Sequence, residues 1–455
     1  MFNILGFDLD ETQVKAIKCN ENAVLVSAGA GSGKTLTIMG KIKYLIENMN
    51  VKSSEILCIS FTNEAVNSLK NKLLSIGYNI DVLTFHKLSL NIIGKNYSIV
   101  DENYLAYIID EYFKSYVRYN KKNFNKLKRY LYTYRNDIFN TKEYKALTRT
   151  IETFIKLAKS NDYSINEIYV FYRKSFLLNR IILKFIIDIM LIYKRELESL
   201  KKIDFDDMIH LAKDKVKTSS INYKYIIIDE FQDTSLVRFN LIKEIIEKCN
   251  SKIFVVGDDW QSIYRFSGCN LDLFINFKDY FNNARYFTLE YTYRNSNELI
   301  YVTSNFIMKN KHQLRKSIKS NKNLKRPIKI IFNCNIYDLI ESIDGDILII
   351  GRNNKDIANI NYGNKLTIHK SKGLECENVI LVNSDNIPNK MKNEKIINKV
   401  LKEHDYILYE EERRLFYVAL TRTKSNVYIM VNKKISPFVK ELIHEYREYI
   451  EIKKY

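Results

Sequence analysis

Residues 28–35, AGAGSGKT, have the types and the spacing of a loop that holds the phosphates of a nucleoside triphosphate. Its three glycines permit backbone angles that side chains would prevent, so successive N–H groups can point at phosphate oxygens where a helix begins. The Lys34 ammonium is predicted to reach the β- and γ-phosphates, and the Thr35 hydroxyl to bind Mg²⁺. The first position of the usual pattern is alanine here. The predicted phosphate-binding residues are Ala28, Gly29, Ala30, Gly31, Ser32, Gly33, Lys34 and Thr35.

Residues 223–235, YKYIIIDEFQDTS, supply the carboxylates that such a loop requires. The apolar run 225–228 predicts a strand that is buried on both faces of a parallel sheet. Asp229 would then lie at the carboxyl end of the strand, near the Mg²⁺, and Glu230 would polarise the attacking water as a general base. An acidic solvated turn is the alternative, and the presence of the phosphate loop disfavours it.

Residues 252–268, KIFVVGDDWQSIYRFSG, predict another buried strand followed by a polar cluster that contains Gln261. A glutamine just beyond a core strand could contact a γ-phosphate. It could equally be an amide that stabilises the loop, and the spacing leaves both interpretations open.

The elements that position these groups are expected in a chain of several domains. The chain has 455 residues, of which 46% are hydrophobic, and this length suggests two to four domains. The net charge of +19 favours a polyanionic partner, with nucleic acid first, although abundant Lys, Asn, Ile and Tyr would also follow from an AT-rich coding sequence.

The cysteines and the apolar stretches indicate a cytoplasmic protein. The six cysteines are scattered without a C-x-x-C pair, which favours neither a zinc site nor a disulfide framework. The longest apolar stretch, residues 180–196, is broken by Lys184 and Asp188 and predicts a buried helix. We therefore expect no membrane association.

The order of several segments along the chain makes the pattern specific. These segments are LDETQVKAI, AGAGSGKT, ILCISFTNEAVNSLKNKL, DVLTFHKLSLNII, IIIDEFQDTS, VGDDWQSIYRFSG, LEYTYRNSNELI, LTIHKSKGLECENVILV and EERRLFYVALTRTKSNVYIMV. In their types and order they resemble the motifs of the UvrD/Rep-type superfamily 1 DNA helicases, and the resemblance covers most of the chain. The detail of GDDWQSIYRFSG and TIHKSKG is most similar to the helicase IV group.

The resemblance implies roles for residues around the nucleotide. Arg294 and Arg422 would stabilise charge on the γ-phosphate from a second domain, so that closing the cleft assembles the catalytic site. Gln13 would sense the adenine, Tyr293 would stack on it, and Glu375 would bind the ribose. Surface salt bridging is the alternative for the two arginines.

The resemblance also implies contacts with a DNA strand. Phe61, His86 and Phe266 occupy positions that face the strand in the family, with Tyr264 and His369 as further candidates. Base stacking on aromatic rings suits such a role. Without the resemblance, an aromatic residue in these loops is more often part of the core.

Two positions depart from the family pattern. Many members have Trp-Arg where this chain has Phe266 and Ser267, so the strength of DNA binding does not follow from the resemblance. Many also have arginine directly after the phosphate loop where this chain has Leu36, which puts nucleotide affinity or base selectivity in doubt.

The predicted fold class is α/β, with two RecA-like P-loop NTPase domains that contain parallel sheets and a helical insertion in the first. We expect residues 1–97 and 201–277 to form the first domain, 98–200 the insertion, and 278–455 the second domain. The insertion is rich in Lys, Arg and aromatic residues, which suits contact with a nucleic-acid backbone. A helical face exposed to solvent is the alternative interpretation. The short distance from ILIIGRNN to KLTIHKSKG leaves no room for a second accessory insertion.

The expected function is that of an ATP-dependent DNA helicase or translocase, 3′ to 5′ by resemblance, in DNA repair, recombination or replication restart. Its substrates would be ATP with Mg²⁺ and single-stranded or tailed duplex DNA. The alternatives are the motor subunit of a nuclease–helicase complex, with a separate nuclease or repair protein as partner, and a translocase that unwinds weakly alone.

Overall fold

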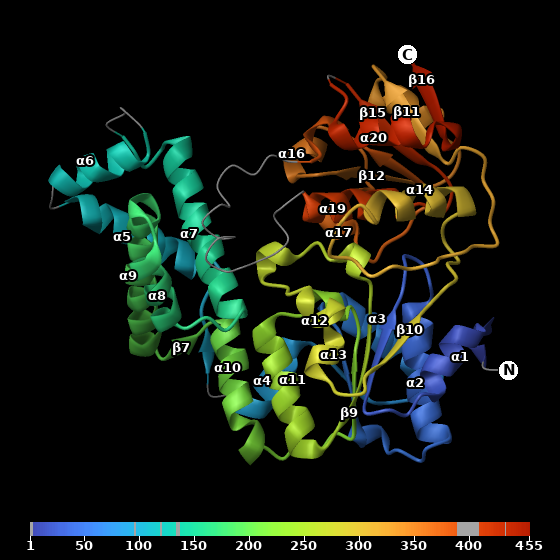
Figure 1. Cartoon of the computed structure of the whole chain (residues 1–455), viewed down its shortest axis with the longest axis horizontal. Coiled ribbons are helices and arrows are strands. Elements are labelled where there is room, and N and C mark those ends of the chain that lie inside the picture. The colour runs from blue at the N-terminus through green and yellow to red at the C-terminus, as the bar shows by residue number, and fades with distance from the viewer. Residues whose placement is uncertain (1–2, 95–96, 119–120, 133–136, 389–408, 433) are drawn as a thin grey trace.

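The computed structural model describes residues 3–94, 97–118, 121–132, 137–388, 409–432 and 434–455 (Figure 1). It contains two six-stranded sheets in which every pair of neighbouring strands is parallel. The α/β prediction with two parallel sheets is therefore confirmed. Across the described residues, no helix is long and apolar enough to cross a membrane.

The first sheet places the predicted catalytic segments at one edge. Its strand order is β10-β3-β9-β8-β4-β5, so β3, β9 and β8 are neighbours. Their side chains are almost all buried, as expected for strands covered by helices on both faces. Because the strands are parallel, the residues that follow them meet at the same edge. The strands are β3 (Ala23–Ser27), β4 (Ile56–Ile59), β5 (Asp81–Leu83), β8 (Tyr225–Ile228), β9 (Lys252–Gly257) and β10 (Arg285–Thr288).

The predicted boundary at residue 278 needs a correction. Strand β10 lies beyond that boundary, yet Arg285 to Thr288 pair with Val24 to Ser27 of β3. The first sheet therefore continues to Thr288. The reason is that a strand joins the sheet whose edge accepts its backbone hydrogen bonds, and this choice leaves no mark in the local sequence.

The second sheet has the order β13-β12-β14-β15-β11-β16. Between β12 and β13 the chain forms only the short helix α16 (Asn354–Ile357). The predicted second domain also includes residues 389–408, which lie outside the described residues. The strands are β11 (Ile328–Phe332), β12 (Ile347–Gly351), β13 (Lys365–Thr367), β14 (Asn378–Leu381), β15 (Val427–Val431) and β16 (Ile450–Lys454).

Helices cover both sheets, and short hairpin strands β1 (Asn3–Ile4) and β2 (Phe7–Asp8) precede them. The helices of the first domain are α1 (Glu11–Lys18), α2 (Lys34–Glu47), α3 (Asn63–Ser75), α4 (Phe85–Ile93), α10 (Phe205–Lys215), α11 (Leu236–Cys249), α12 (Asp272–Ile275) and α13 (Phe277–Tyr280). Those of the second domain, besides α16, are α14 (Asn297–Ile307), α15 (Ile336–Glu341), α17 (Ile368–Ser371), α19 (Glu410–Leu420) and α20 (Pro437–Glu445).

A helical insertion stands beside the two sheets, on the left of Figure 1. Its side chains form a core of their own that includes Phe113, Phe154 and Ile186. Two short parallel strands, β6 (Ser98–Ile99) and β7 (Lys202–Ile203), join where the chain leaves and re-enters the first domain. The helices are α5 (Tyr104–Arg118), α6 (Lys121–Tyr130), α7 (Lys142–Ser160), α8 (Ile165–Lys174) and α9 (Leu177–Leu200).

Candidate active site

The phosphate loop connects β3 to α2 in a conformation that requires glycine. Gly31 and Gly33 have φ of 74° and 79°, in the left-handed region that residues with side chains rarely adopt. A Cβ on Gly31 would lie only 2.5 Å from the Cβ of Arg294, so the second domain approaches the loop at this glycine. The loop and the start of α2 therefore lie directly beside a residue of the other domain.

Lys34 and Glu230 meet in the structure although 196 positions separate them. The Lys34 Nζ lies 2.6 Å from Glu230 Oε1, and Gln232 Nε2 donates to Glu230 Oε2 at 2.6 Å. Burial alone would raise the pKa of Glu230, but the nearby charges of Lys34 and Lys372 outweigh it and lower the pKa to about 2. Glu230 is thus an anion that can accept a proton from water.

The backbone at the end of β8 is strained at Glu230. Glu230 has a φ of 49°, which is uncommon for a residue with a side chain and persists where the surroundings hold it. Its N–H donates to Asp229 Oδ1 at 2.9 Å, which stabilises the turn. Burial, followed by the charge of Glu230, raises the pKa of Asp229 to about 7. A bound cation would favour its ionised form.

Arg422 follows α19 and reaches the same place from the second domain. The residue is 1% exposed, and its guanidinium donates to Gln261 Oε1 at 2.9 Å. Burial lowers the pKa of Arg422 to about 9, with the nearby charge of Arg294 as the next cause. The amide of Gln261 therefore links the first domain to a cation of the second.

Arg294 and Glu375 form a pair within the second domain. The Arg294 Nε lies 2.8 Å from Glu375 Oε2, and Lys424 contacts the other carboxylate oxygen at 3.0 Å. Tyr293, the neighbour of Arg294, is half exposed beside the loop, and its N–H donates to the carbonyl of Gly31 at 3.0 Å.

Gln13 is buried against the phosphate loop. Its side-chain oxygen accepts from the Asp10 N–H at 2.9 Å in a capping box at the start of α1. Its Nε2 donates to the carbonyl of Ser32 at 3.4 Å. The predicted adenine-sensing residue thus also fixes the first helix on the loop.

One cavity of about 660 Å³ lies between the two domains and collects most of these groups. Lys34 and Arg422 line it from opposite domains, and its chemistry suits a polyphosphate because cations of both domains and part of the phosphate loop line it. Ala28, Gly29 and Ala30 are not in its lining. The predicted residues that line it are Gln13, Gly31, Ser32, Gly33, Lys34, Thr35, Phe61, Asp229, Glu230, Gln261, Tyr264, Tyr293, Arg294, Glu375 and Arg422.

The predicted DNA-facing aromatics form a row that crosses between the domains. The rings of Phe61 and Tyr264 are stacked, with centroids 6.2 Å apart and planes at 10°. The Tyr264 hydroxyl donates to the carbonyl of His369 at 2.9 Å, and the His369 and Phe266 rings meet at 5.4 Å. Phe266 is 53% exposed, so this ring can accept a further stacked ring.

His86 lies apart from that row. Its ring packs against Phe205 at 4.6 Å, and burial, followed by the charge of Arg238, lowers its pKa to about 4. Arg238 on α11 lies over the Phe61 ring at 4.7 Å. Its Nε and Nη1 are buried and have no hydrogen-bond partner within the described ranges.

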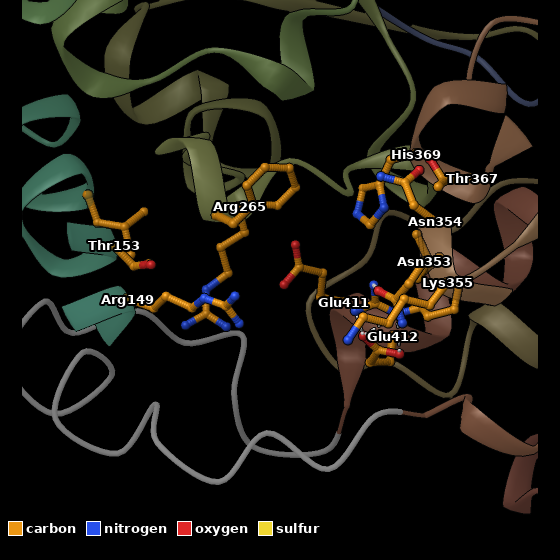
Figure 2. Close-up of a pocket in the computed structure, with 14 residues that line it drawn as sticks. Arg149, Thr153, Arg265, Asn353, Asn354, Lys355, Thr367, His369, Glu411 and Glu412 are labelled. Atoms are coloured by element: carbon orange, nitrogen blue, oxygen red, sulfur yellow. Dashed lines mark hydrogen bonds and ion pairs between the residues drawn. The ribbon is translucent and has the colours of Figure 1, made fainter. Parts of the chain in front are cut away.

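A second cavity, of about 680 Å³, lies between the insertion, the loop after β9 and the second domain. Figure 2 shows Arg149 and Arg265 on one side of it and Asn353 to Lys355 on the other. Phe266 and His369 also line it, so it continues from the aromatic row.

Several site residues carried no assigned role in the sequence. Lys372 forms an ion pair with the buried Asp233 and lies 4.9 Å from the Tyr264 ring. The sequence TIHKSKG that contains Lys372 resembles a family motif, but the sequence does not indicate that Asp233 is the partner of Lys372. Arg238 and Arg149 gave no signal at all, because each is one basic residue on a helix.

Two family models match regions of the chain that carry most of these residues. The model described as UvrD/REP helicase N-terminal domain matches residues 9–282, and the UvrD-like helicase C-terminal domain matches residues 359–434. The chain therefore belongs to the UvrD/REP helicase family.

Individual relatives share just over a quarter of their residues with the chain. DNA helicase IV of Escherichia coli (strain K12) is 28% identical over 484 residues, covering 95% of this chain and 70% of the relative. ATP-dependent DNA helicase Rep of Buchnera aphidicola subsp. Schizaphis graminum is 28% identical and PcrA of Bacillus subtilis (strain 168) 27% identical, covering 75% and 70% of this chain. The chain spans 50% and 41% of the length of these last two relatives.

Proposed function

We propose that the chain is an ATP-dependent DNA helicase or translocase that moves 3′ to 5′ along single-stranded DNA. The observation that carries the proposal is the cavity between the domains, where Lys34 and Glu230 of the first domain face Arg294 and Arg422 of the second. Hydrolysis of ATP needs charge compensation and an oriented water, and both kinds of group are present. The family membership and the helicases among the relatives support the same function.

In this proposal the residues of both domains act on ATP. The loop N–H groups and Lys34 bind the β- and γ-phosphates, and Glu230 accepts the proton of the attacking water. Arg294 and Arg422 stabilise the charge that spreads over the transferred phosphoryl group. Mg²⁺, held by Thr35 and Asp229, would supply further charge at the phosphates. Both residues line the cavity, and a hydroxyl with a carboxylate suits this cation.

Nucleotide-dependent closure would then move the DNA strand. Phe61 and Tyr264 line the nucleotide cavity, while Phe266 and His369 line the second cavity. Motion of one domain against the other would therefore shift His369, in the second domain, relative to Phe61, Tyr264 and Phe266 in the first. Stacked bases and contacted phosphates are the features that such surfaces hold. The buried donors of Arg238, which have no hydrogen-bond partner among the described residues, suit a phosphate near Phe61.

The test is strand separation by the purified chain, with ATP and Mg²⁺, on a duplex with either a 3′ or a 5′ single-stranded tail. Unwinding from the 3′ tail alone supports the proposal in full. ATP hydrolysis stimulated by single strands, without unwinding from either tail, would instead indicate a translocase or the motor subunit of a nuclease–helicase complex. Absence of DNA-stimulated hydrolysis would refute the proposal.

A further inference from the structure

A strap of residues 314–319 runs from the second domain back to the phosphate loop. Ile318 packs on Gly29, since a Cβ on that glycine would collide with Ile318 Cδ1. The N–H of Lys319 donates to the carbonyl of Glu290 at 2.7 Å, and the carbonyl of Lys319 accepts from the Thr292 N–H at 2.9 Å. The strap thus packs on the loop through Ile318, and backbone hydrogen bonds hold it to residues 290–292.

Lys316 is the centre of a buried cluster of charges beneath this strap. Its side chain and those of Asp258 and Asp259 are all 0% exposed. The Nζ lies 2.5 Å from Asp258 Oδ1 and 2.7 Å from Asp259 Oδ1, and it donates to the carbonyl of Ala28 at 3.1 Å. Charges removed from water are costly unless they are paired, so one lysine compensates two adjacent carboxylates here.

Asp258 connects Lys316 to Gln261, the candidate γ-phosphate contact, through a hydrogen bond. Gln261 Nε2 donates to Asp258 Oδ2 at 2.5 Å, and Gln261 Oε1 accepts from Arg422 Nη2 at 2.9 Å. An amide has distinct donor and acceptor ends, so the acceptor at Asp258 decides which end faces Arg422. If the amide turned over, its NH₂ group would face the guanidinium, and two donors would oppose each other.

We propose that Lys316 is a positioning residue for ATP hydrolysis, because it compensates the Asp258 carboxylate and thereby holds the Gln261 amide with its oxygen on Arg422. The inference rests on the proposed function, in which Arg422 acts on the γ-phosphate. It adds a contact that runs from the phosphate loop, through the strap, to the arginine of the other domain. Lys316 itself touches no substrate.

Two variants test the inference by different routes. Lys316→Met removes the cation and leaves two buried carboxylates without it. Asp258→Asn keeps the shape and leaves Asp259 to pair with Lys316. In that variant Lys316 donates to the oxygen of the new amide, so the NH₂ group of that amide faces Gln261. Gln261 must then turn its own amide by about 180° to present its oxygen to that NH₂ group, and its NH₂ group then faces Arg422. Both variants should lower kcat for ATP by about tenfold or more, with the KM for ATP within about threefold of wild type.

The specific readout is a double-mutant cycle with Gln261→Ala. Because Lys316 and Asp258 act through Gln261, adding either variant to Gln261→Ala should lower kcat no further. Lys41→Met is the matched control. Lys41 is a similarly buried lysine that donates to the carbonyls of Ile17 and Cys19 at 2.9 and 2.6 Å, so its loss should lower stability and leave kcat unchanged.

The outcomes separate the inference from the proposed function. The inference would be overturned if folded Asp258→Asn had a kcat within about twofold of wild type. It would also be overturned if the effects of Lys316→Met or Asp258→Asn on kcat multiplied with that of Gln261→Ala. Neither result would contradict the proposed function. If Lys316→Met does not fold, Asp258→Asn decides. Wild-type protein without DNA-stimulated ATP hydrolysis would overturn both.

Discussion

Replacing Arg422 by lysine tests whether this residue acts on the transferred phosphoryl group or only holds the domains together. A guanidinium has five N–H groups in a fixed fork, whereas an ammonium has three on one atom. Within the described ranges, Arg422 donates to Val418 O at 3.0 Å, Leu374 O at 3.3 Å, Gln261 Oε1 at 2.9 Å and Thr421 Oγ1 at 3.3 Å. Four donors are thus used, and one Nη1 N–H remains for a phosphate oxygen.

The size of the effect follows from that geometry. Lysine keeps the charge but cannot reach Gln261 and the phosphate at once. We expect kcat to fall by about 10² to 10³, the usual cost of losing one oriented donor to developing charge. Two or three lost hydrogen bonds should lower the free energy of unfolding by about 1–3 kcal/mol.

The assay is steady-state ATP hydrolysis at saturating single-stranded DNA, together with ATP binding and thermal unfolding. The matched control is Arg413→Lys on α19, because Arg413 makes a comparable fork to Glu441 at 2.7 and 2.9 Å away from the nucleotide cavity. It should lose similar stability and keep kcat. A folded Arg422→Lys with kcat within about threefold of wild type, or an equal fall in Arg413→Lys, would refute the reasoning.

Four further expectations concern the base, the DNA surface and pH. Glu230→Gln should bind ATP and DNA but hydrolyse ATP about 10²- to 10⁴-fold more slowly, and turnover near wild type would remove Glu230 from the role of base. Phe266→Ala should weaken single-strand binding by about 1–3 kcal/mol with little change in unfolding temperature, since the ring is half exposed. Arg149→Ala should make the plot of log association constant for single-stranded DNA against log salt concentration less steep by about 0.7. Replacing the exposed Lys156 of the same helix by alanine should leave that slope unchanged. Equal slopes in both variants would argue against a phosphate contact at Arg149. Burial lowers the pKa of His86 from 6.5 to about 4, so between these two values protons bind the unfolded chain but not the folded one. Stability should therefore fall as pH falls from 6.5 to about 4, and fall less in His86→Gln; equal losses of unfolding temperature would contradict this.

Much of the fold and of the nucleotide site could be predicted from the sequence, since both have local signatures. Continuous apolar runs such as residues 225–228 mark strands buried on both faces, and a loop of glycines with Lys34 marks a phosphate site. The order of the motif-like segments indicated the UvrD/Rep-type helicases, and the two matching family models confirm this family. These features depend on neighbours within a few residues, so the sequence by itself determined them.

The tertiary structure alone decided which distant groups meet. The pairing of β10 with β3 moved the boundary of the first sheet, and His86 packs on Phe205 away from the aromatic row. Lys316 looks like any surface lysine in its segment, yet its side chain is fully buried between two aspartates that lie far earlier in the chain. Burial and partnership are set by long-range packing of whole elements, and a single chain records no local pattern from which that packing can be computed.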